Sequence, residues 1–412
     1  MSGKSVALCK FLMLPLLVII VFIAGDIQVK AAVPSSTTTI KMKETVSGRQ
    51  AVGNHTVLYN SLLKGETYHV LREDEKYYYI PFGNETVYLS KRYAEPAGKG
   101  KTPVTAKSKK SFTTKKLVAV YADANTSSRL IGRINGDVRV PIFDHNKKFY
   151  KVNYGGVYGY VKARDLYPDS GVPVLMYHHL VEKKVGTSFA KNSSVLEVTK
   201  FKEQIDYLHK NEWIAVPIEV FEEWKNARKN LPTKVVVISF DDGYKSTIKY
   251  AYPILKKYKM NAVSFLITSR MKEREVPWDA SATQILSFEE MNATNDVFSY
   301  QHHTHALHSF HSKIGKSYLE TETADAVTRD LIEGKRLIES NYNKVHEVSY
   351  LAYPYGINTK SNIEVAKSVG IRMAFTIDVG NVQMSDDSFK MKRQRIHSAH
   401  TLKKFEKIVQ GK

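Results

Sequence analysis

Cysteine is almost absent from this sequence, since Cys9 is the only one in 412 residues. It stands before the first apolar run, so it is not placed to carry the lipid of a lipoprotein. No cysteine occurs after residue 31, and disulfides therefore contribute nothing to the stability of that part of the chain.

Long apolar runs are scarce as well. The N-terminal run, residues 11–24, is short for a membrane span and follows Lys4 and Lys10. Small residues in Val29-Lys30-Ala31 suit a cleavage site, so residues 1–31 are predicted to be a signal peptide, with a retained membrane anchor as the alternative. An exported, lysine-rich chain without cysteine fits the envelope of a Gram-positive bacterium, either wall-associated or anchored on the outer face.

Nucleic-acid-binding motifs are missing, although the net charge is +20. The positive excess is densest in residues 34–170, and residues 99–116 hold seven lysines and no acidic residue. Proline, glycine, serine and threonine within this stretch predict a flexible linker. A basic arm on an exported protein more plausibly meets teichoic acid or anionic lipid headgroups than nucleic acid.

An internal repeat precedes residue 170. Residues 63–89 and 134–161 share short alternating runs rich in Tyr, Val and Lys, at an offset of about seventy residues. Such runs predict small all-β modules. They resemble tandem bacterial SH3-like domains, here residues 38–98 and 117–169, and this resemblance implies binding to cell-wall polymers such as peptidoglycan and teichoic acid. Modules that only space a catalytic domain from the membrane are the alternative.

Strands and helices are expected to alternate in residues 172–412. The apolar patterns predict strands at 172–177, 235–240, 262–267 and 348–353, with helices at 198–210 and 324–342. Alternation of this kind implies a parallel α/β sheet or barrel. Its core is expected to need no strand from the repeats.

Two adjacent carboxylates, Asp241 and Asp242, follow the buried strand at 235–240. Parallel α/β folds build their sites where strands end, so both side chains are placed for chemistry. The competing interpretation is a simple Asp-Gly turn into a helix that starts near Ser246.

A histidine cluster, His302, His303, His305 and His308, lies about sixty residues further on. This density indicates a metal site, because Asp and His ligands around Zn²⁺ with an open position form a hydrolytic arrangement. His303 and His308 would lie about 140° apart on a regular helix, so both can bind one ion only after a strand end and a tight turn. The pair His305 and His308 would instead suit one helix face.

Four motifs in this region resemble the metal-dependent polysaccharide deacetylases, carbohydrate esterase family four. Their order and spacing agree from about residue 172 to 409. The resemblance implies a distorted (β/α) barrel with fewer than eight strands, and the histidine spacing is similar to that of the poly-N-acetylglucosamine deacetylases. The motifs are Val174-Leu175-Met176-Tyr177-His178-His179, Ser239-Phe240-Asp241-Asp242-Gly243-Tyr244, His303-Thr304-His305-Ala306-Leu307-His308 and Tyr353-Pro354-Tyr355-Gly356.

The resemblance also implies roles for single residues. Asp242, His303 and His308 would hold a divalent metal, most plausibly Zn²⁺, with Co²⁺ or Ni²⁺ as alternatives. Asp241 would be the general base, since a base must accept a proton and cannot also be tightly ligated. The backbone N–H of Tyr355 would contribute to an oxyanion hole.

The leaving amine needs a proton, and His397 is the candidate acid, with Asp378 as a carboxylate that could orient it. The competing interpretation of His397 is a solvated residue at a strand end. Tyr353 replaces the arginine with which the third motif commonly begins, and tyrosine cannot lower the pKa of Asp241 as a guanidinium would. Either Arg393 or Arg395 substitutes for it, or the base is tuned differently.

Together these features predict an exported, metal-dependent N-deacetylase, expected to be a monomer, that acts on an N-acetylglucosamine-containing envelope polymer. The histidine spacing favours a poly-N-acetylglucosamine-like polysaccharide, whereas the repeats favour peptidoglycan. A non-catalytic wall-binding protein with an inactive barrel is the main alternative, supported by Tyr353. An O-acetyl esterase is another, because the same attack serves esters and amides.

Overall fold

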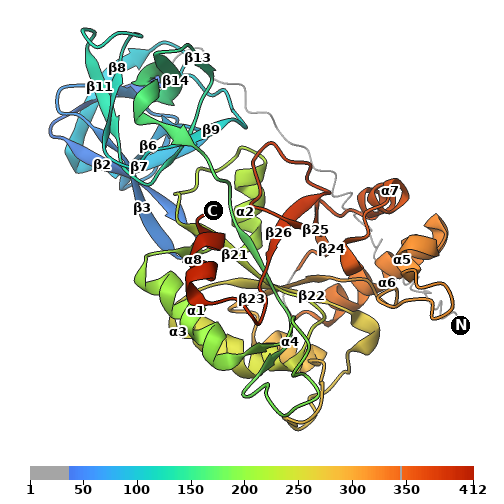
Figure 1. The fold of residues 1–412 in the computed structure, drawn as a ribbon. Helices are drawn as coiled ribbons and strands as arrows, with labels where there is room; N and C mark the ends of the chain where they lie inside the picture. Colours follow the sequence, from blue (N-terminus) through green and yellow to red (C-terminus); the bar gives the residue numbers. More distant parts are fainter. Residues whose placement is uncertain (1–36, 344–345) are drawn as a thin grey trace, which may run out of the picture. The chain divides into compact units, whose positions relative to one another are not determined.

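The computed structural model describes residues 37–343 and 346–412, and residues 36–412 form one compact unit. The predicted signal peptide lies outside the described residues. Among those that are described, no helix has the length and apolarity needed to cross a membrane. Figure 1 follows the chain from an all-β region in blue and green to a region of strands and helices in yellow and red.

Short antiparallel strands make up the N-terminal region. The first repeat contains β1 (Thr37–Met42), β2 (Val46–Val52), β3 (His55–Leu62), β4 (Thr67–His69), β5 (Arg72–Glu73), β6 (Tyr77–Phe82), β7 (Glu85–Ser90) and β8 (Ala94–Gly100). The second contains β9 (Ser111–Thr113), β10 (Val118–Tyr121), β11 (Leu130–Ile134), β12 (Arg139–Pro141), β13 (Asp144–His145), β14 (Phe149–Tyr154), β15 (Val157–Lys162) and β16 (Tyr167–Pro168).

The two repeats share one ten-stranded sheet, in the order β13-β14-β15-β10-β11-β3-β2-β7-β6-β5. Strand β11 of the second repeat pairs with β3 of the first, where Ile134 faces Asn60. A further pairing joins β14 to β6, where Tyr154 faces Phe82. The two repeats are therefore joined by backbone hydrogen bonds between their strands and are not separate domains.

The lysine-rich segment 99–116 is held against both repeats. It begins in β8 and contains β9. Between these strands, Val104 N–H donates to Gly156 O (2.8 Å) and Asn84 Nδ2 donates to Ser108 O (2.8 Å), while Lys107 Nζ donates to Asn84 O. The prediction of a flexible linker is wrong here, because these bonds fix the backbone along its length.

A closed ring of parallel strands follows. Its order is β17-β26-β25-β24-β23-β22-β21, and β21 returns to β17, while β20 adds to the outside of β21. The seven-stranded ring confirms the predicted barrel with fewer than eight strands. The strands of this half are β17 (Val174–Tyr177), β18 (Leu180–Val181), β19 (Leu196–Glu197), β20 (Ile214–Ala215), β21 (Val235–Phe240), β22 (Ala262–Leu266), β23 (Phe298–His302), β24 (Tyr350–Ala352), β25 (Met373–Val379) and β26 (Met391–Arg395).

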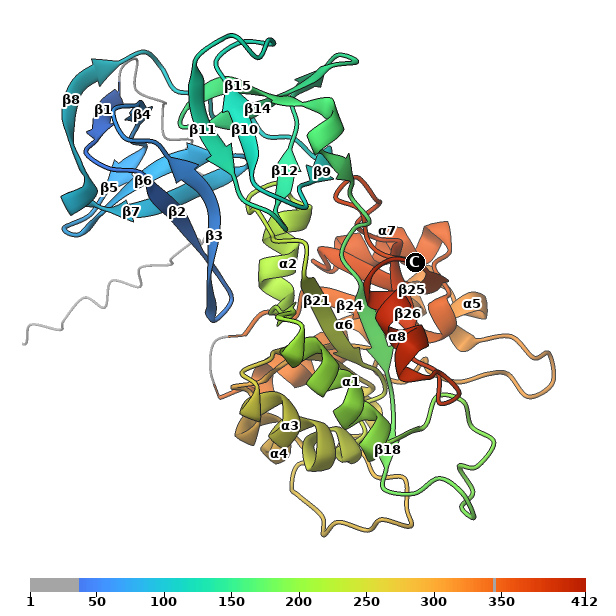
Figure 2. The same cartoon turned by 60° about the vertical axis from the view of Figure 1, so that its left-hand side comes forward.

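Helices surround the ring because each has one apolar face. In α1, Phe201, Ile205 and Leu208 are buried at helical spacing. Figure 2 shows α1, α3 and α4 gathered on one part of the barrel, with α5, α6 and α7 elsewhere around it. The helices are α1 (Val198–Lys210), α2 (Ile218–Lys225), α3 (Tyr252–Lys257), α4 (Phe288–Ala293), α5 (Tyr318–Thr321), α6 (Ala324–Asn341), α7 (Lys360–Ser368) and α8 (Leu402–Val409).

The β region contacts the barrel through buried groups. Asn230, which lies just before β21, receives the hydroxyl of Tyr59 on its carbonyl (3.2 Å) and donates from Nδ2 to Phe82 O (2.9 Å). Arg139 donates to the carbonyls of Gly171 (2.8 Å) and Pro232. One hydrophobic core continues from the β region into the barrel. Among the described residues, the barrel sheet takes no strand from the repeats, as expected, but its hydrophobic core is shared with them.

Candidate metal centre and active-site cleft

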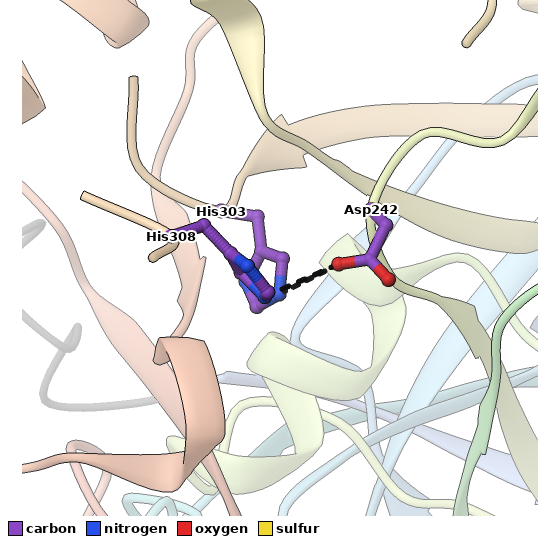
Figure 3. A group of neighbouring side chains, drawn as sticks. All are labelled: Asp242, His303 and His308. Carbon is purple, nitrogen blue, oxygen red and sulfur yellow. Dashed lines mark ion pairs between the residues drawn. The ribbon is translucent and has the colours of Figure 1, made fainter. Parts of the chain in front are cut away.

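Three side chains meet at the carboxyl ends of two barrel strands. Asp242 follows β21, His303 follows β23, and His308 returns to the same point five residues later. Nε2 of His308 lies 3.3 Å from Asp242 Oδ1 and Nε2 of His303 lies 3.5 Å from it. Figure 3 shows both imidazole rings facing the same carboxylate. One donor atom from each residue lies within 4.8 Å of the other two, which is the arrangement of a three-ligand metal site.

A tight turn brings His308 back, as the spacing of the two histidines required. Thr304 has a φ of 71°, in the left-handed region. The carboxylate of Asp330 on α6 then accepts the N–H groups of His305 (2.8 Å) and Ala306 (2.7 Å), which fixes the turn. His305 instead places Nδ1 2.9 Å from Thr268 Oγ1, so the alternative pair of His305 and His308 is not the one that meets Asp242.

Hydrogen bonds set the orientation of each histidine. His303 Nδ1 lies 2.6 Å from Ala352 O, which can only accept, so this nitrogen carries a proton and Nε2 is the nitrogen that faces Asp242. His308 Nδ1 lies 3.2 Å from the hydroxyl of Tyr355. Both nitrogens of His302 have backbone partners, Thr304 N–H (2.8 Å) and Leu331 O (2.9 Å), and His302 is therefore not available as a ligand.

The charges of these groups fit a cation. Burial opposes ionisation of Asp242, but the hydrogen bond and charge of His303 outweigh it and hold the pKa of Asp242 well below its usual value. Burial and the neighbouring His303 lower the pKa of His308 to about 4, so its ring is neutral near pH 7. Asp242 Oδ1 is buried and accepts no hydrogen bond among the described residues. A carboxylate and two imidazole nitrogens are a donor set typical of catalytic Zn²⁺ sites with an open position.

The neighbouring carboxylate, Asp241, is paired with arginine rather than directed at the donor set. Arg393 on β26 donates from Nη1 to Oδ1 (2.7 Å) and from Nη2 to Oδ2 (2.8 Å), and both side chains are almost fully buried. Burial opposes the charge of Asp241, but Arg393 and nearby histidines outweigh it, so the pKa of Asp241 is lowered. Arg393 thus supplies the cation that Tyr353 cannot. Arg395 points elsewhere and donates to Ser194 Oγ (2.8 Å).

The donor set opens into a cleft of about 450 Å³. Its lining combines the metal-site residues with hydroxyl, arginine and aliphatic side chains. The lining residues are Met176, His178, Ser194, Asp241, Asp242, His303, His308, Tyr353, Tyr355, Ile377, Val379 and Arg395.

Three predicted residues have different outcomes around this cleft. Tyr355 lies in it with a φ of 57°, which places a strained backbone beside the donor set. His397 is not among the lining residues, and its Nδ1 accepts the N–H of Ala399 (3.1 Å) in an exposed turn. Asp378 is exposed, and its N–H donates to Thr376 Oγ1 (3.0 Å). The structure therefore does not bring His397 or Asp378 to the metal-site residues.

A histidine without a role in the sequence interpretation does lie in the cleft. His178 places Nε2 4.0 Å from Asp241 Oδ2 and is partly exposed. Burial lowers the pKa of His178 despite the two nearby aspartates. The signal for it was the position of His178 directly after strand β17, at the same barrel edge as Asp241.

Comparisons with known proteins agree with this geometry. The polysaccharide deacetylase family matches residues 228–374, and the bacterial SH3 domain family matches residues 116–167. A poly-beta-1,6-N-acetyl-D-glucosamine N-deacetylase of Staphylococcus aureus (strain MSSA476) is 27% identical over 245 residues, which cover 54% of this chain and 82% of the relative. The enzyme of the same name from Staphylococcus epidermidis is 26% identical over 283 residues, covering 68% and 90%.

Among solved structures, IcaB from Ammonifex degensii is 23% identical, with a TM-score of 0.50 over 58% of this chain and 97% of that one. This likeness shows the fold of the barrel. The chain therefore carries a polysaccharide deacetylase (NodB) domain with poly-N-acetylglucosamine deacetylase homologues, preceded by a bacterial SH3 domain.

Proposed function

We propose that the protein is a metal-dependent N-deacetylase acting on an N-acetylglucosamine-containing polymer of the cell envelope. The observation that carries the proposal is that two adjacent carboxylates have different surroundings. Asp242 faces His303 and His308, while Asp241 is held beside them by Arg393. Hydrolysis needs one group to bind the metal and another to move a proton, and this cleft offers both.

Asp242, His303 and His308 would hold the metal, with Zn²⁺ as the best match to the donor set. When bound, the metal supplies a Lewis acid that activates water and polarises the amide carbonyl. Asp241 stays ionised because of Arg393, and the remaining lone pairs of its oxygens can accept the proton of the attacking water. The N–H of Tyr355 is proposed to stabilise the carbonyl oxygen as negative charge develops on it.

His178 is the better candidate for the group that protonates the leaving amine. It lines the cleft on the side of Asp241, whereas His397 does not line it. A general acid must reach the reacting atoms directly or through one water, and the place of His178 in the cleft supports this role. We therefore transfer to His178 the role first predicted for His397.

Two features bear on the polymer and its location. The named relatives act on poly-beta-1,6-N-acetyl-D-glucosamine, which supports a polymer of that kind as substrate. The SH3 region supports attachment to the wall of a Gram-positive envelope, where peptidoglycan is the competing substrate. The case for an inactive barrel is weaker than Tyr353 alone suggested, because Arg393 already serves Asp241.

The test is acetate release by the purified, zinc-loaded protein. The panel should contain β-1,6-linked and β-1,4-linked N-acetylglucosamine oligomers, peptidoglycan fragments and an O-acetylated glycan, with His308→Ala as the inactive control. Release from at least one N-acetylated glycan is expected. Release only from the O-acetylated glycan would identify an esterase, and no release from any of them would favour the non-catalytic wall-binding protein.

A further inference from the structure

A second hollow, of about 200 Å³, lies next to the catalytic cleft. It is formed by the chain segments that follow β17, β21 and β22, all of which leave the barrel at the carboxyl ends of their strands. Four ring-bearing side chains line it: His179, Phe189, Tyr250 and Trp278. None of them takes part in the proposed reaction.

Consecutive residues line the two hollows. His178 lines the cleft and the next residue, His179, lines the second hollow. The ring of His179 contacts Tyr244 (5.0 Å between centroids), which stands two residues after the ligand Asp242, and also contacts Phe189 (4.9 Å). His178 and His179 thus place a wall of each hollow one residue apart in the chain.

The wall of the hollow is built around a buried histidine. His179 is 4% exposed, and its Nδ1 lies 2.9 Å from Ser246 Oγ. The same oxygen accepts the N–H of Leu180 (3.0 Å), and Ser246 is itself fully buried. The buried Ser246 hydroxyl has no other acceptor among the described residues, so its proton goes to His179 Nδ1 and Nε2–H is the remaining donor of the ring.

The other rings are not packed away. Phe189, Tyr250 and Trp278 are each half-buried. Trp278 meets Tyr250 edge to face, with centroids 5.5 Å apart, and the Tyr250 hydroxyl donates to the exposed Glu182 Oε1 (3.2 Å). All three rings keep part of their surface exposed, and Glu182 stands beside Tyr250.

Half-open rings with a few polar groups suit a sugar. A pyranose has an apolar face of C–H groups, which can lie against an aromatic ring, and hydroxyl groups at its edge that can meet a carboxylate or an N–H donor. We propose that this hollow binds a second N-acetylhexosamine residue of the same glycan chain, while the residue to be deacetylated occupies the cleft. Trp278 and Phe189 provide the stacking surface and Glu182 the hydroxyl partner. This proposal rests on the proposed function, because it assumes that the substrate is a polymer containing N-acetylglucosamine.

The test compares short and long substrates. In Trp278→Ala, kcat/KM for a pentasaccharide should fall by about 3- to 10-fold through KM, as expected for the loss of one aromatic contact, while the disaccharide changes by less than about 2-fold. Trp278→Phe should keep most of the activity on the long substrate. Tyr252→Ala, a half-buried aromatic that lines neither hollow, is the matched control and should show no dependence on length.

Binding of the pentasaccharide by titration calorimetry separates this proposal from the proposed function. Weaker binding in Trp278→Ala supports the second hollow even if no acetate is released from any glycan. Equal losses on the short and long substrates, or unchanged binding and turnover of the pentasaccharide, would overturn it.

Discussion

Replacing Arg139 by methionine should destabilise the protein by about 3–5 kcal/mol, the usual result of removing one partner of a buried ion pair. Arg139 is 2% exposed and places Nε 3.1 Å from Asp169 Oδ1, whose side chain is 3% exposed. The substitution leaves the carboxylate of Asp169 with only Ser111 Oγ (2.7 Å) and Gly171 N–H (2.9 Å), and removes donors from two carbonyls.

The loss should also depend on pH. Burial opposes the charge of Asp169, but Arg139 and the hydrogen bonds outweigh it, so the pKa of Asp169 lies below its ordinary value. A carboxyl with a lowered pKa stabilises the fold above about pH 4 and loses that contribution as the pH falls. Without Arg139 this contribution disappears, so the difference in unfolding free energy between wild type and variant should stay constant from about pH 7 to pH 5 and shrink as the pH falls below about 4.

Urea unfolding followed by circular dichroism measures both effects. Arg129→Met is the matched control, since Arg129 pairs with Glu66 at an exposed site and should lose less than about 1 kcal/mol. The double variant Arg139→Met/Asp169→Asn should lose less unfolding free energy than the two single variants lose in total, because the two side chains interact. If Arg139→Met were as mild as Arg129→Met, the β region would not be tied to the barrel in the way these bonds require.

Three further predictions concern the site and a buried lysine. His303→Ala should reduce bound zinc to sub-stoichiometric levels by metal analysis, whereas His305→Ala should leave it in place; the reverse result would favour the pair His305 and His308. Asp241→Asn should lower the rate of acetate release by about 10²–10⁴-fold at unchanged zinc content, and loss of zinc would make Asp241 a ligand. Burial lowers the pKa of Lys225 to about 8, so between pH 8 and 10.5 the unfolded chain binds a proton that the folded protein does not. The unfolding free energy should therefore rise by up to about 3 kcal/mol over this range, and the rise should be absent in Lys225→Met.

Local patterns predicted the alternating strands and helices, whereas the barrel and the choice of Asp242, His303 and His308 came from the resemblance to the deacetylases. The strand at 235–240 and the helix at 198–210 have the predicted bounds. Both predictions used only the pattern of apolar residues that are neighbours in the sequence. The pair His303 and His308 required a turn, and the sequence could state that requirement. It could not show that Asp330, from a helix further along the chain, would hold the turn.

Other choices depended on contacts between distant segments. Arg393 and Arg395 stand two residues apart on β26 and so share a face, which is why strand alternation could not choose between them. Burial distinguishes the two arginines, since Arg393 is buried against Asp241 and Arg395 is exposed. The same limit applied to His178 and His397, whose distances from Asp241 follow from the closure of the ring. It also applied to the repeats, because pairing of β11 with β3 leaves no local signal.

The left-handed backbone at Asp242, Thr304 and Tyr355 sets stability and activity against each other in this protein. A β-branched residue such as Thr304 is strained there by about 1–2 kcal/mol, and glycine would relieve the strain. Glycine would also free the turn that returns His308 to Asp242. Selection for thermal stability alone would therefore favour substitutions at these positions, and the resulting variants would fold well but bind metal poorly. Selection for turnover would keep the strained residues.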